Sequence, residues 1–244
     1  LGARSVSELE ETADECRKLD AEVLITPTDV TDVSQVEGLI AATVERYSTI
    51  DILVNNAGIG GPVGVLQDND LDAWINTVQI NLIGVYLCCR AVIPVMKRQN
   101  AGRIVNLSGA GAANAWAKMS AYCSSKAAVV RLTEVLALEL ADTKITVNAL
   151  GPGSVHTRMW DEMTEDAAKA GADLIHEVGL RVTSGGGASI DRCASLAVLL
   201  AGSEVDGLSG RMISASTDDF ESLTLSIPEI MASDVYTIRR VDPL

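Results

Sequence analysis

The sequence predicts an α/β protein with a doubly wound parallel sheet and helices on both faces, which makes three α/β/α layers. Apolar runs of strand length alternate with helical patterns, which is typical of βαβ units. Hydrophobic residues make up 48% of the 244 residues, but aromatic residues only 3%. A core of Ala, Val, Leu and Ile suits strands that helices cover on both sides. No repeat or long linker divides the chain, so we expect a single domain.

The elements follow one another in a regular order along the chain. The first helix begins after Ser5, because Ser5 and Glu8 form a capping box, and it extends to about Lys18. The strands expected after it occupy residues 22–27, 50–56, 103–108, 145–150 and 210–216. The helices between them occupy residues 32–47, 71–98, 120–141 and 191–201. The second strand is apolar on both faces, and the ligand crevice of such a sheet lies beyond the carboxyl ends of its strands.

Charge and hydropathy argue against two classes of partner. The formal net charge is −14 and the pI is near 4.5, whereas nucleic-acid binding requires a basic surface. Charged residues such as Arg131, Glu134 and Glu139 interrupt the apolar runs before these reach the ~18 residues of a membrane span. We therefore expect no nucleic acid and no membrane as a partner.

Cysteines and histidines argue against metal and hydrolase chemistry. The cysteines are odd in number and have no paired metal-ligand spacing: Cys16, Cys88, Cys89, Cys123 and Cys193. We interpret them as free thiols in a reducing compartment and expect a cytoplasmic protein. Two histidines are too few for a metal site or a Ser-His-Asp triad, so we expect no metal.

A tyrosine and a lysine lie one turn apart in the expected helix 120–141. Residues i and i+4 share a helix face about 6 Å apart, which makes Tyr122 and Lys126 neighbours. A free phenol, with a pKa of about 10, is a poor acid–base catalyst at neutral pH. A nearby ammonium group favours phenolate and lowers that pKa toward ambient pH. The pair predicts a proton donor and acceptor for a carbonyl–alcohol reaction; the alternative is two solvated side chains without a role.

Other motifs surround this pair in an ordered set. NNAG ends the strand 50–56, NLS ends the strand 103–108, YCSSK lies on the next helix, and NALGPG ends the strand 145–150. In this order the chain resembles the short-chain dehydrogenase/reductase family, from Leu1 to about Ser216. The resemblance implies a Rossmann-like fold. It also implies an NAD(P)-dependent oxidoreductase that interconverts a carbonyl and an alcohol by hydride transfer.

The resemblance assigns roles to individual residues. Tyr122 is the acid–base group, Lys126 also binds the nicotinamide ribose, and Asn81 positions a water for proton relay. Besides Tyr122 and Lys126, the residues expected along the cofactor are Arg4, Ser5, Asp29, Val30, Asn56, Ala57, Gly58, Pro152, Gly153, Val155 and Thr157. Asn55 is expected to link strands. The alternatives are a local amide for Asn81 and a turn residue for Asp29.

Arg4 indicates which cofactor the chain prefers. A carboxylate at the end of the first strand would bind the 2′-hydroxyl of NAD, but Ala3 stands there. Arg4 follows with a guanidinium that suits a 2′-phosphate. We therefore expect NADP(H) to be preferred over NAD(H).

The chain departs from the family pattern at two places. Gly109 stands where the family has its catalytic serine. We name Ser108 for that role, although alternation along a strand turns it away from the substrate unless the strand end bulges. The family also begins with a strand, a TGxxxGxG loop and a helix, and no such loop occurs here. We expect these elements to precede Leu1 in the intact protein, and no cofactor binding if they do not.

The chain divides into two regions. Residues 1–216 match the family's catalytic domain, and 217–244 form an extension that could cover the active site or reach a neighbouring subunit. The helices 71–98 and 120–141 carry apolar residues on more than one face, so we expect a homodimer or homotetramer.

Three functions remain open. The first is the oxidoreductase, whose partner is a small carbonyl or alcohol compound; Trp116 and Trp160 could line its pocket. Gly109 and the absent loop favour a second, a non-catalytic relative that binds a nucleotide or a protein partner. A nucleotide-sugar epimerase is the third, but little room is left for its larger substrate region.

Overall fold

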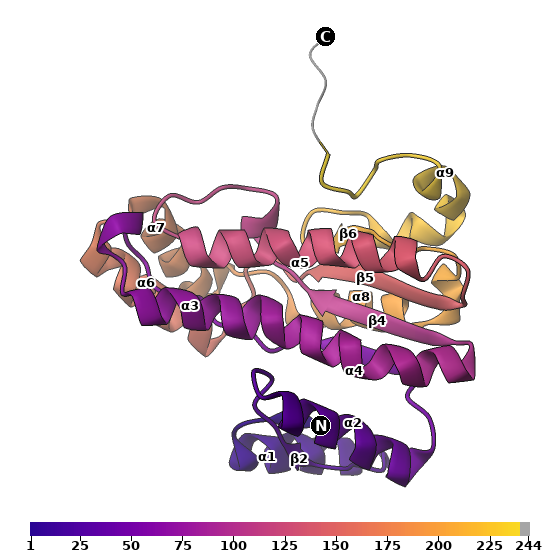
Figure 1. Cartoon of the computed structure of the whole chain (residues 1–244). Coiled ribbons are helices and arrows are strands. Elements are labelled where there is room, and N and C mark those ends of the chain that lie inside the picture. The colour runs from indigo at the N-terminus through magenta and orange to yellow at the C-terminus, as the bar shows by residue number, and fades with distance from the viewer. Residues whose placement is uncertain (240–244) are drawn as a thin grey trace.

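The computed structural model describes residues 1–239 and has an α/β fold with helices on both faces of parallel strands (Figure 1). The strands are β1 (Gly2–Ala3), β2 (Thr26–Pro27), β3 (Ile52–Asn55), β4 (Gly102–Leu107), β5 (Ile145–Gly151) and β6 (Met212–Ser214). The α-helices are α1 (Val6–Arg17), α2 (Val33–Tyr47), α3 (Leu71–Val78), α4 (Gly84–Gln99), α5 (Ser120–Glu139), α6 (Arg158–Ala170), α7 (Asp173–Arg181), α8 (Ile190–Ala201) and α9 (Ile227–Met231). The paired strands run parallel, as the alternating patterns predict.

Elements lie where the sequence places them, but the bounds differ. The expected strand 22–27 is reduced to β2, because only Thr26 and Pro27 pair with β1. The expected helix 71–98 is a continuous run, Leu71–Gln99, in which a π-helical turn (Gln79–Ile83) joins α3 to α4. Helices α6 and α7 form in the segment before α8, where the sequence pattern does not predict two helices.

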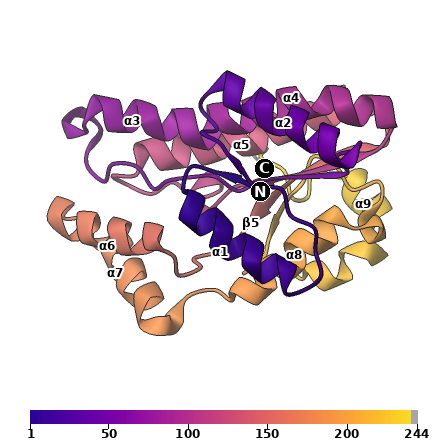
Figure 2. The same ribbon diagram turned by 90° about the horizontal axis from the view of Figure 1, so that it is seen from below.

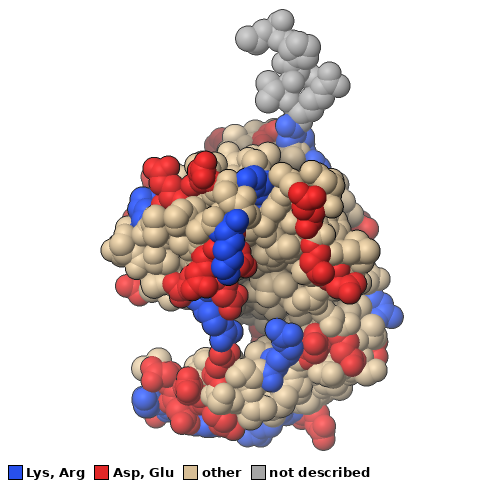
Figure 3. Space-filling model, turned by 90° about the vertical axis from the view of Figure 1, so that its left-hand side faces the viewer, with Lys and Arg blue, Asp and Glu red and all other residues tan. Residues whose placement is uncertain are grey.

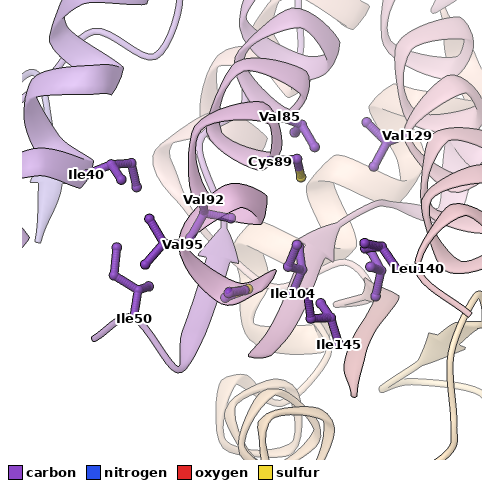
Figure 4. Packing of buried hydrophobic residues seen from close by; sticks show 12 residues of the cluster. Ile40, Ile50, Val85, Cys89, Val92, Val95, Ile104, Val129, Leu140 and Ile145 are labelled. Carbon is purple, nitrogen blue, oxygen red and sulfur yellow. The ribbon is translucent and has the colours of Figure 1, made fainter. Parts of the chain in front are cut away.

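The helices form a layer on each side of the larger sheet. Helices α4 and α5 lie on one side and α8 on the other (Figure 2). Between α4, α5 and the strands, Val92 packs in one buried cluster with Ile104, Val129 and Ile145 (Figure 4). Because this shared apolar core holds α4 and α5 together, it also fixes the positions of residues at their N-terminal ends.

The strands form two separate sheets. Strands β1 and β2 make one, and the other has the order β3-β4-β5-β6. Within the described residues, β1 and β3 do not pair. Ile52 and Val54 on β3 are 47% and 46% exposed, although the sequence predicts that both faces of this strand are covered. Figure 3 shows a hollow between the part that carries α1 and α2 and the rest of the molecule.

Helix α2 connects the two sheets through apolar contacts with α4. Val36 packs with Leu87 and Cys88, and Ile40 belongs to the cluster around Val92. The smaller sheet is therefore held mainly by one helix–helix contact rather than by strand pairing.

Among the described residues, the helix Leu71–Gln99 is long and apolar enough to cross a membrane by length and composition. Its most apolar window has a mean hydropathy of 1.7, so the expectation that no run reaches this limit is wrong. Half of that window is buried inside the protein, where α4 packs against α2 and β4. Buried core helices pass the same test, so the feature is weak evidence for a membrane span.

The C-terminal extension packs against its own chain as far as residue 239. Phe220, Leu223 and Ile230 join the core cluster of β6 and α8. Arg211, which precedes β6, donates a hydrogen bond to the carbonyl of Ile230 at 3.0 Å. Residues 240–244 of the predicted extension lie outside the described residues.

Candidate active site

Tyr122 and Lys126 lie on the buried face of α5. Their side chains are 9% and 4% exposed, so the alternative of two solvated side chains is wrong. The Lys126 Nζ donates to the carbonyl of Leu107, the last residue of β4, at 2.9 Å. The pair therefore lies at the carboxyl end of β4, where a doubly wound sheet forms its ligand crevice.

Burial determines the acidity of both groups in the free protein. Removal from water lowers the pKa of Lys126 to about 8, because it penalises the ammonium form. Burial raises the pKa of Tyr122 to about 12, because it penalises the phenolate. The sequence predicts the opposite direction for the phenol. The difference arises because burial of the phenol dominates its pKa, while the ammonium of Lys126 bonds to the Leu107 carbonyl instead.

The Tyr122 phenol is enclosed by glycine and tryptophan. A β-carbon at Gly109 would lie 2.3 Å from the phenol oxygen, so the hydroxyl rests directly on this glycine. The Trp116 ring stacks on the phenol ring with centroids 6.1 Å apart and planes 6° apart. In the described residues no hydrogen bond occupies the phenol oxygen, yet it is not among the buried atoms that lack a partner. Among the described residues, the hydroxyl therefore keeps its hydrogen-bonding capacity unused.

Ser108 points to a different group. Its hydroxyl donates to the backbone carbonyl of Lys126 at 3.4 Å and is buried. The neighbouring Gly109, which follows in the extended chain, is the residue under the phenol. The geometry therefore does not support Ser108 as the hydroxyl beside Tyr122, because alternation along the strand end turns the two residues to opposite sides.

Asn81 lies in the π-helical turn between α3 and α4 and is fully buried. Its Oδ1 accepts from the backbone N–H of Ile59 at 2.8 Å, and its Nδ2 donates to Ser125 at 3.1 Å. A β-carbon at Gly58 would lie 3.2 Å from Asn81 Oδ1 and 3.3 Å from Lys126 Nζ. The three residues thus converge at the end of β3, although Asn81 also makes the local bonds of its alternative role.

The residues expected along the adenosine part of a cofactor lie on β1, β2 and their loops. Arg4 is exposed, whereas the Ser5 hydroxyl caps α1 by accepting from the N–H of Glu8. The Asp29 carboxylate accepts from the N–H and hydroxyl of Thr31, and these bonds lower its pKa, with a smaller effect from Arg4. Asp29 thus makes the turn contacts of its alternative role while lying close to Arg4.

Other predicted cofactor contacts follow β2 and β3. Val30 packs against α4, where a β-carbon at Gly84 would lie 2.7 Å from its Cγ2. Asn56 and Ala57 are exposed just after β3. Asn55 donates to Asn106 Oδ1 at 2.8 Å across the strands, which confirms its linking role.

The loop after β5 has a conformation that requires glycine. Gly153 has φ +79°, and a β-carbon there would lie 2.8 Å from the Cβ of Ser216. Pro152 and Val155 are half-buried in this loop, and Thr157 is exposed at the N-terminus of α6. These residues lie at the carboxyl end of β5, beside the end of β4 that holds Lys126.

The described residues contain no group of three or more His, Cys, Asp or Glu side chains that could hold a metal ion. The cysteines are all free, and Cys88 and Cys89 are buried. Burial raises their pKa values to about 11 and about 12. These two thiols are therefore protonated at neutral pH and are poor nucleophiles.

Comparison with known sequences adds a separate observation to this geometry. The family model described as short chain dehydrogenase matches residues 1–168. The chain belongs to this family.

Two dehydrogenases are among the relatives to which this chain is similar in sequence. The (2S)-[(R)-hydroxy(phenyl)methyl]succinyl-CoA dehydrogenase subunit BbsD of Thauera aromatica is 40% identical over 159 residues, which are 63% of this chain and 61% of that protein. The D-beta-hydroxybutyrate dehydrogenase of Rhizobium meliloti is 32% identical over 197 residues, 79% of this chain and 76% of that protein. The chain thus spans less than two thirds of the Thauera protein.

Solved structures of dehydrogenases and reductases have the same fold. NAD+-bound xylitol dehydrogenase matches with a TM-score of 0.81 and 29% identity, over 88% of this chain and 86% of that one. An actinorhodin polyketide ketoreductase variant with NADPH matches with a TM-score of 0.79 and 32% identity, over 87% and 84%. These likenesses confirm the Rossmann-like, single-domain α/β prediction, and the cofactors of the two proteins support a nicotinamide cofactor of this family's type.

Candidate residues for such a cofactor lie at its two ends rather than at its pyrophosphate. Gly58, Asn81 and Lys126 lie close together at the end of β3, because a β-carbon at Gly58 would lie 3.2 Å from Asn81 Oδ1 and 3.3 Å from Lys126 Nζ. They suit a ribose, whose hydroxyls can bond to an amide and an ammonium. The sequence offers no glycine-rich turn for the pyrophosphate. Candidate contacts are therefore present for the nicotinamide ribose and, through Arg4, for the adenosine side, but not for the pyrophosphate.

Sequence reasoning missed the contacts that close the site. A β-carbon at Gly60 would lie 2.6 Å from Met163, so α6 packs directly on the loop after β3. Lys118 donates to the carbonyls of Ala170 and Gly171 at 2.7 and 2.6 Å and ties the loop before α5 to the end of α6. The apolar spacing of Met159 and Met163 on α6 is the signal that could have shown this face.

We expect Lys126→Met to stabilise the protein at neutral pH. The pKa shift from 10.5 to about 8 corresponds to about 3 kcal/mol of unfavourable burial. Lys126→Met removes this cost but also removes the hydrogen bond to Leu107, which is worth about 1 kcal/mol. The free energy of unfolding should therefore rise by about 2 kcal/mol. Urea unfolding at about pH 7 measures it.

The pH dependence separates this cause from a general packing effect. Unfolded lysine holds its proton up to about pH 10.5, whereas buried Lys126 releases it near pH 8. Wild-type stability therefore rises between these values, and the advantage of Lys126→Met should shrink by about pH 9.5. The exposed Lys97→Met is the control, for which we expect less than about 0.5 kcal/mol. An advantage of Lys126→Met that is equal at both pH values would contradict the explanation.

Proposed function

We propose that this chain carries the catalytic site of an NAD(P)-dependent oxidoreductase that interconverts a small carbonyl compound and its alcohol. The observation that carries the proposal is the Tyr122 hydroxyl, which has no hydrogen-bond partner in the described residues and lies at the carboxyl end of β4, one turn from the buried Lys126. Family membership supports this class of reaction. Substrate identity does not follow from similarity, since the relatives act on different compounds.

Tyr122 serves as the proton donor to the carbonyl oxygen. A phenol with a pKa of about 12 holds its proton at neutral pH and can donate it when negative charge develops on that oxygen. A nicotinamide cofactor, when bound, supplies the hydride for the carbonyl carbon or takes it in the reverse direction. Lys126 and Asn81 hold a ribose, and an ammonium that moves from Leu107 toward the phenol favours phenolate for the oxidation direction.

Turnover of the reduced cofactor tests this proposal. The full-length protein should oxidise NADPH or NADH in the presence of ketones and aldehydes from a mixed panel, and the loss of cofactor absorbance measures this. Cofactor binding without turnover would favour the second hypothesis, a non-catalytic nucleotide-binding or partner-binding relative. Gly109 is the observation that favours this second hypothesis. The family's serine is absent at that position, and the hydroxyl of Ser108 bonds to the carbonyl of Lys126.

We propose that NADP(H) is the preferred cofactor, with Arg4 as the selecting residue. Arg4 is exposed at the end of β1, and the carboxylate of Asp29, on which Arg4 has a small charge effect, accepts hydrogen bonds from Thr31. We expect kcat/KM with NADPH to exceed that with NADH about tenfold, since a charge-assisted bond is worth about 1.5–3 kcal/mol. Arg4→Ala should remove most of this preference, whereas Arg17→Ala at the other end of α1 should keep it. A preference for NADH in the wild type would refute the assignment.

We also propose a homodimer or homotetramer in the cytoplasm. Helices α4 and α5 carry exposed apolar side chains on their outer faces: Tyr86 (46%), Val135 (41%) and Leu138 (78%). Pairing of subunits through these helices would bury them. Free cysteines suit a reducing compartment. Light scattering after gel filtration measures the oligomeric state, and a monomer would contradict the proposal.

A further inference from the structure

The phenol of Tyr122 belongs to an apolar cluster that the proposed reaction does not use. The large buried side chains of this cluster include Met119, Trp160 and Met163. Val63, Trp116 and Met159 are partly buried and pack against them. The cluster brings together the loop after β3, the loop before α5 and helix α6. A substituent next to a carbonyl at the phenol oxygen would therefore be surrounded by apolar and aromatic side chains.

Two indoles give this cluster flat surfaces. The Trp116 ring lies 6° from the plane of the Tyr122 ring, and Trp160 meets Trp116 at 55° with centroids 6.4 Å apart. Stacked and tilted arrangements at these separations are the favourable geometries for aromatic rings. The thioethers of Met159 and Met163 add contacts that are also favourable for an aromatic ring.

Positive side chains near the cluster are already engaged. Lys118 donates to the carbonyls of Ala170 and Gly171. Arg158, at the start of α6, pairs with Glu8 at 3.2 Å and with Glu162 at 3.8 Å. Lys126 bonds to the Leu107 carbonyl. A carboxylate or phosphate on the substrate would have to displace one of these partners before it gained a charge-assisted bond.

We infer that the substrate is a neutral ketone, or the corresponding secondary alcohol, with an aromatic ring next to the carbonyl carbon, and that Trp116 selects it. The inference rests on the proposed oxidoreductase function. The aromatic ring stacks beside the Trp116 indole while the carbonyl oxygen meets the Tyr122 hydroxyl. Reduction then places hydride on the carbonyl carbon and the phenol proton on the oxygen, and it gives a benzylic alcohol.

Three ketones separate the features of this inference. Acetophenone is neutral and aromatic, 2-butanone is neutral and aliphatic, and acetoacetate carries a carboxylate. With the full chain we expect kcat/KM for acetophenone to exceed that for each of the other two about tenfold or more. Highest turnover with acetoacetate, or equal turnover with acetophenone and 2-butanone, would overturn the inference while leaving the oxidoreductase proposal intact.

Variants of Trp116 test its selecting role. Trp116→Ala should lower the ratio of kcat/KM for acetophenone to kcat/KM for 2-butanone about tenfold, because only acetophenone has a ring that stacks on the indole. Trp116→Phe, which keeps an aromatic surface, should retain most of the preference. Trp74→Phe is the matched control; Trp74 donates to Ser120 at 3.0 Å and lies outside the cluster. An unchanged acetophenone to 2-butanone ratio in Trp116→Ala would assign the preference to another residue.

Binding without turnover distinguishes failure of the inference from failure of the proposed function. Saturation-transfer NMR on cofactor-free protein should detect acetophenone bound to the wild type and a weaker signal with Trp116→Ala. If no ketone is turned over but this difference remains, the aromatic site stands and the oxidoreductase proposal fails. If ketones are turned over and the binding signals of wild type and variant are equal, the inference fails.

Discussion

Tyr122→Phe is expected to lower kcat/KM about 10³-fold for any carbonyl substrate of this chain, because it removes only the proton donor. Acid–base groups of this kind contribute about 10²–10⁴-fold. The remaining ring still stacks on Trp116 and still fills the cluster with Met163. The lost hydroxyl makes no hydrogen bond within the described residues, so the melting temperature should stay within about 2 °C of the wild type.

The same substitution at an exposed tyrosine shows whether the loss of activity comes from the missing proton donor or from a tyrosine-to-phenylalanine change in general. Tyr86 on α4 is 46% exposed, and Tyr86→Phe should leave kcat/KM and the melting temperature unchanged. Cofactor affinity, measured by fluorescence titration, should also survive in Tyr122→Phe, because the ribose contacts proposed for Lys126 and Asn81 are unchanged. Turnover that persists in Tyr122→Phe would show that another group moves the proton.

Gly109→Ala should reduce kcat about 100-fold with little loss of stability. The new β-carbon would lie 2.3 Å from the phenol oxygen and 3.2 Å from Cζ, well inside normal contact distance, so the phenol must move by about 1 Å. A displacement of that size at a reacting group costs about 10²-fold. The backbone itself is not strained, because Gly109 has φ 179°, an extended conformation open to any residue.

Two further glycine variants show whether displacement of the phenol is the cause. Gly38→Ala on the exposed face of α2 meets no atom within 4 Å, so it should keep full activity and add up to ~1 kcal/mol of helix stability. Gly109→Ser displaces the phenol equally but supplies a hydroxyl that can bond to it, so its activity should lie above that of Gly109→Ala. Wild-type kcat in Gly109→Ala would contradict the contact geometry.

The sequence predicted the fold and the location of the candidate site because both depend on spacing. The i, i+4 relation places Tyr122 and Lys126 on one buried face, and strand alternation brings Asn55 to Asn106. Alternation also predicted that the Ser108 side chain turns away, and its hydroxyl bonds to the carbonyl of Lys126; the catalytic role named for Ser108 stays a prediction.

Features that depend on tertiary packing could not be predicted in this way. The pKa of Tyr122 rises because distant segments bury the phenol, including the Trp116 loop and helix α6. The π-helical turn around Asn81 adds a residue to one turn, which leaves no clear mark in an apolar pattern. The exposure of Ile52 depends on which strand pairs with β3, a long-range property that the apolar character of β3 does not report.

The division of the strands between two sheets bears on how a dinucleotide would bind. Arg4 and Asp29 belong to the β1–β2 part, whereas Lys126 and Asn81 belong to the β3–β6 part. A molecule that contacted both sets of residues would bind best when the two parts are correctly placed relative to each other. Its affinity would therefore depend on the packing of α2 against α4 as well as on the residues that it touches.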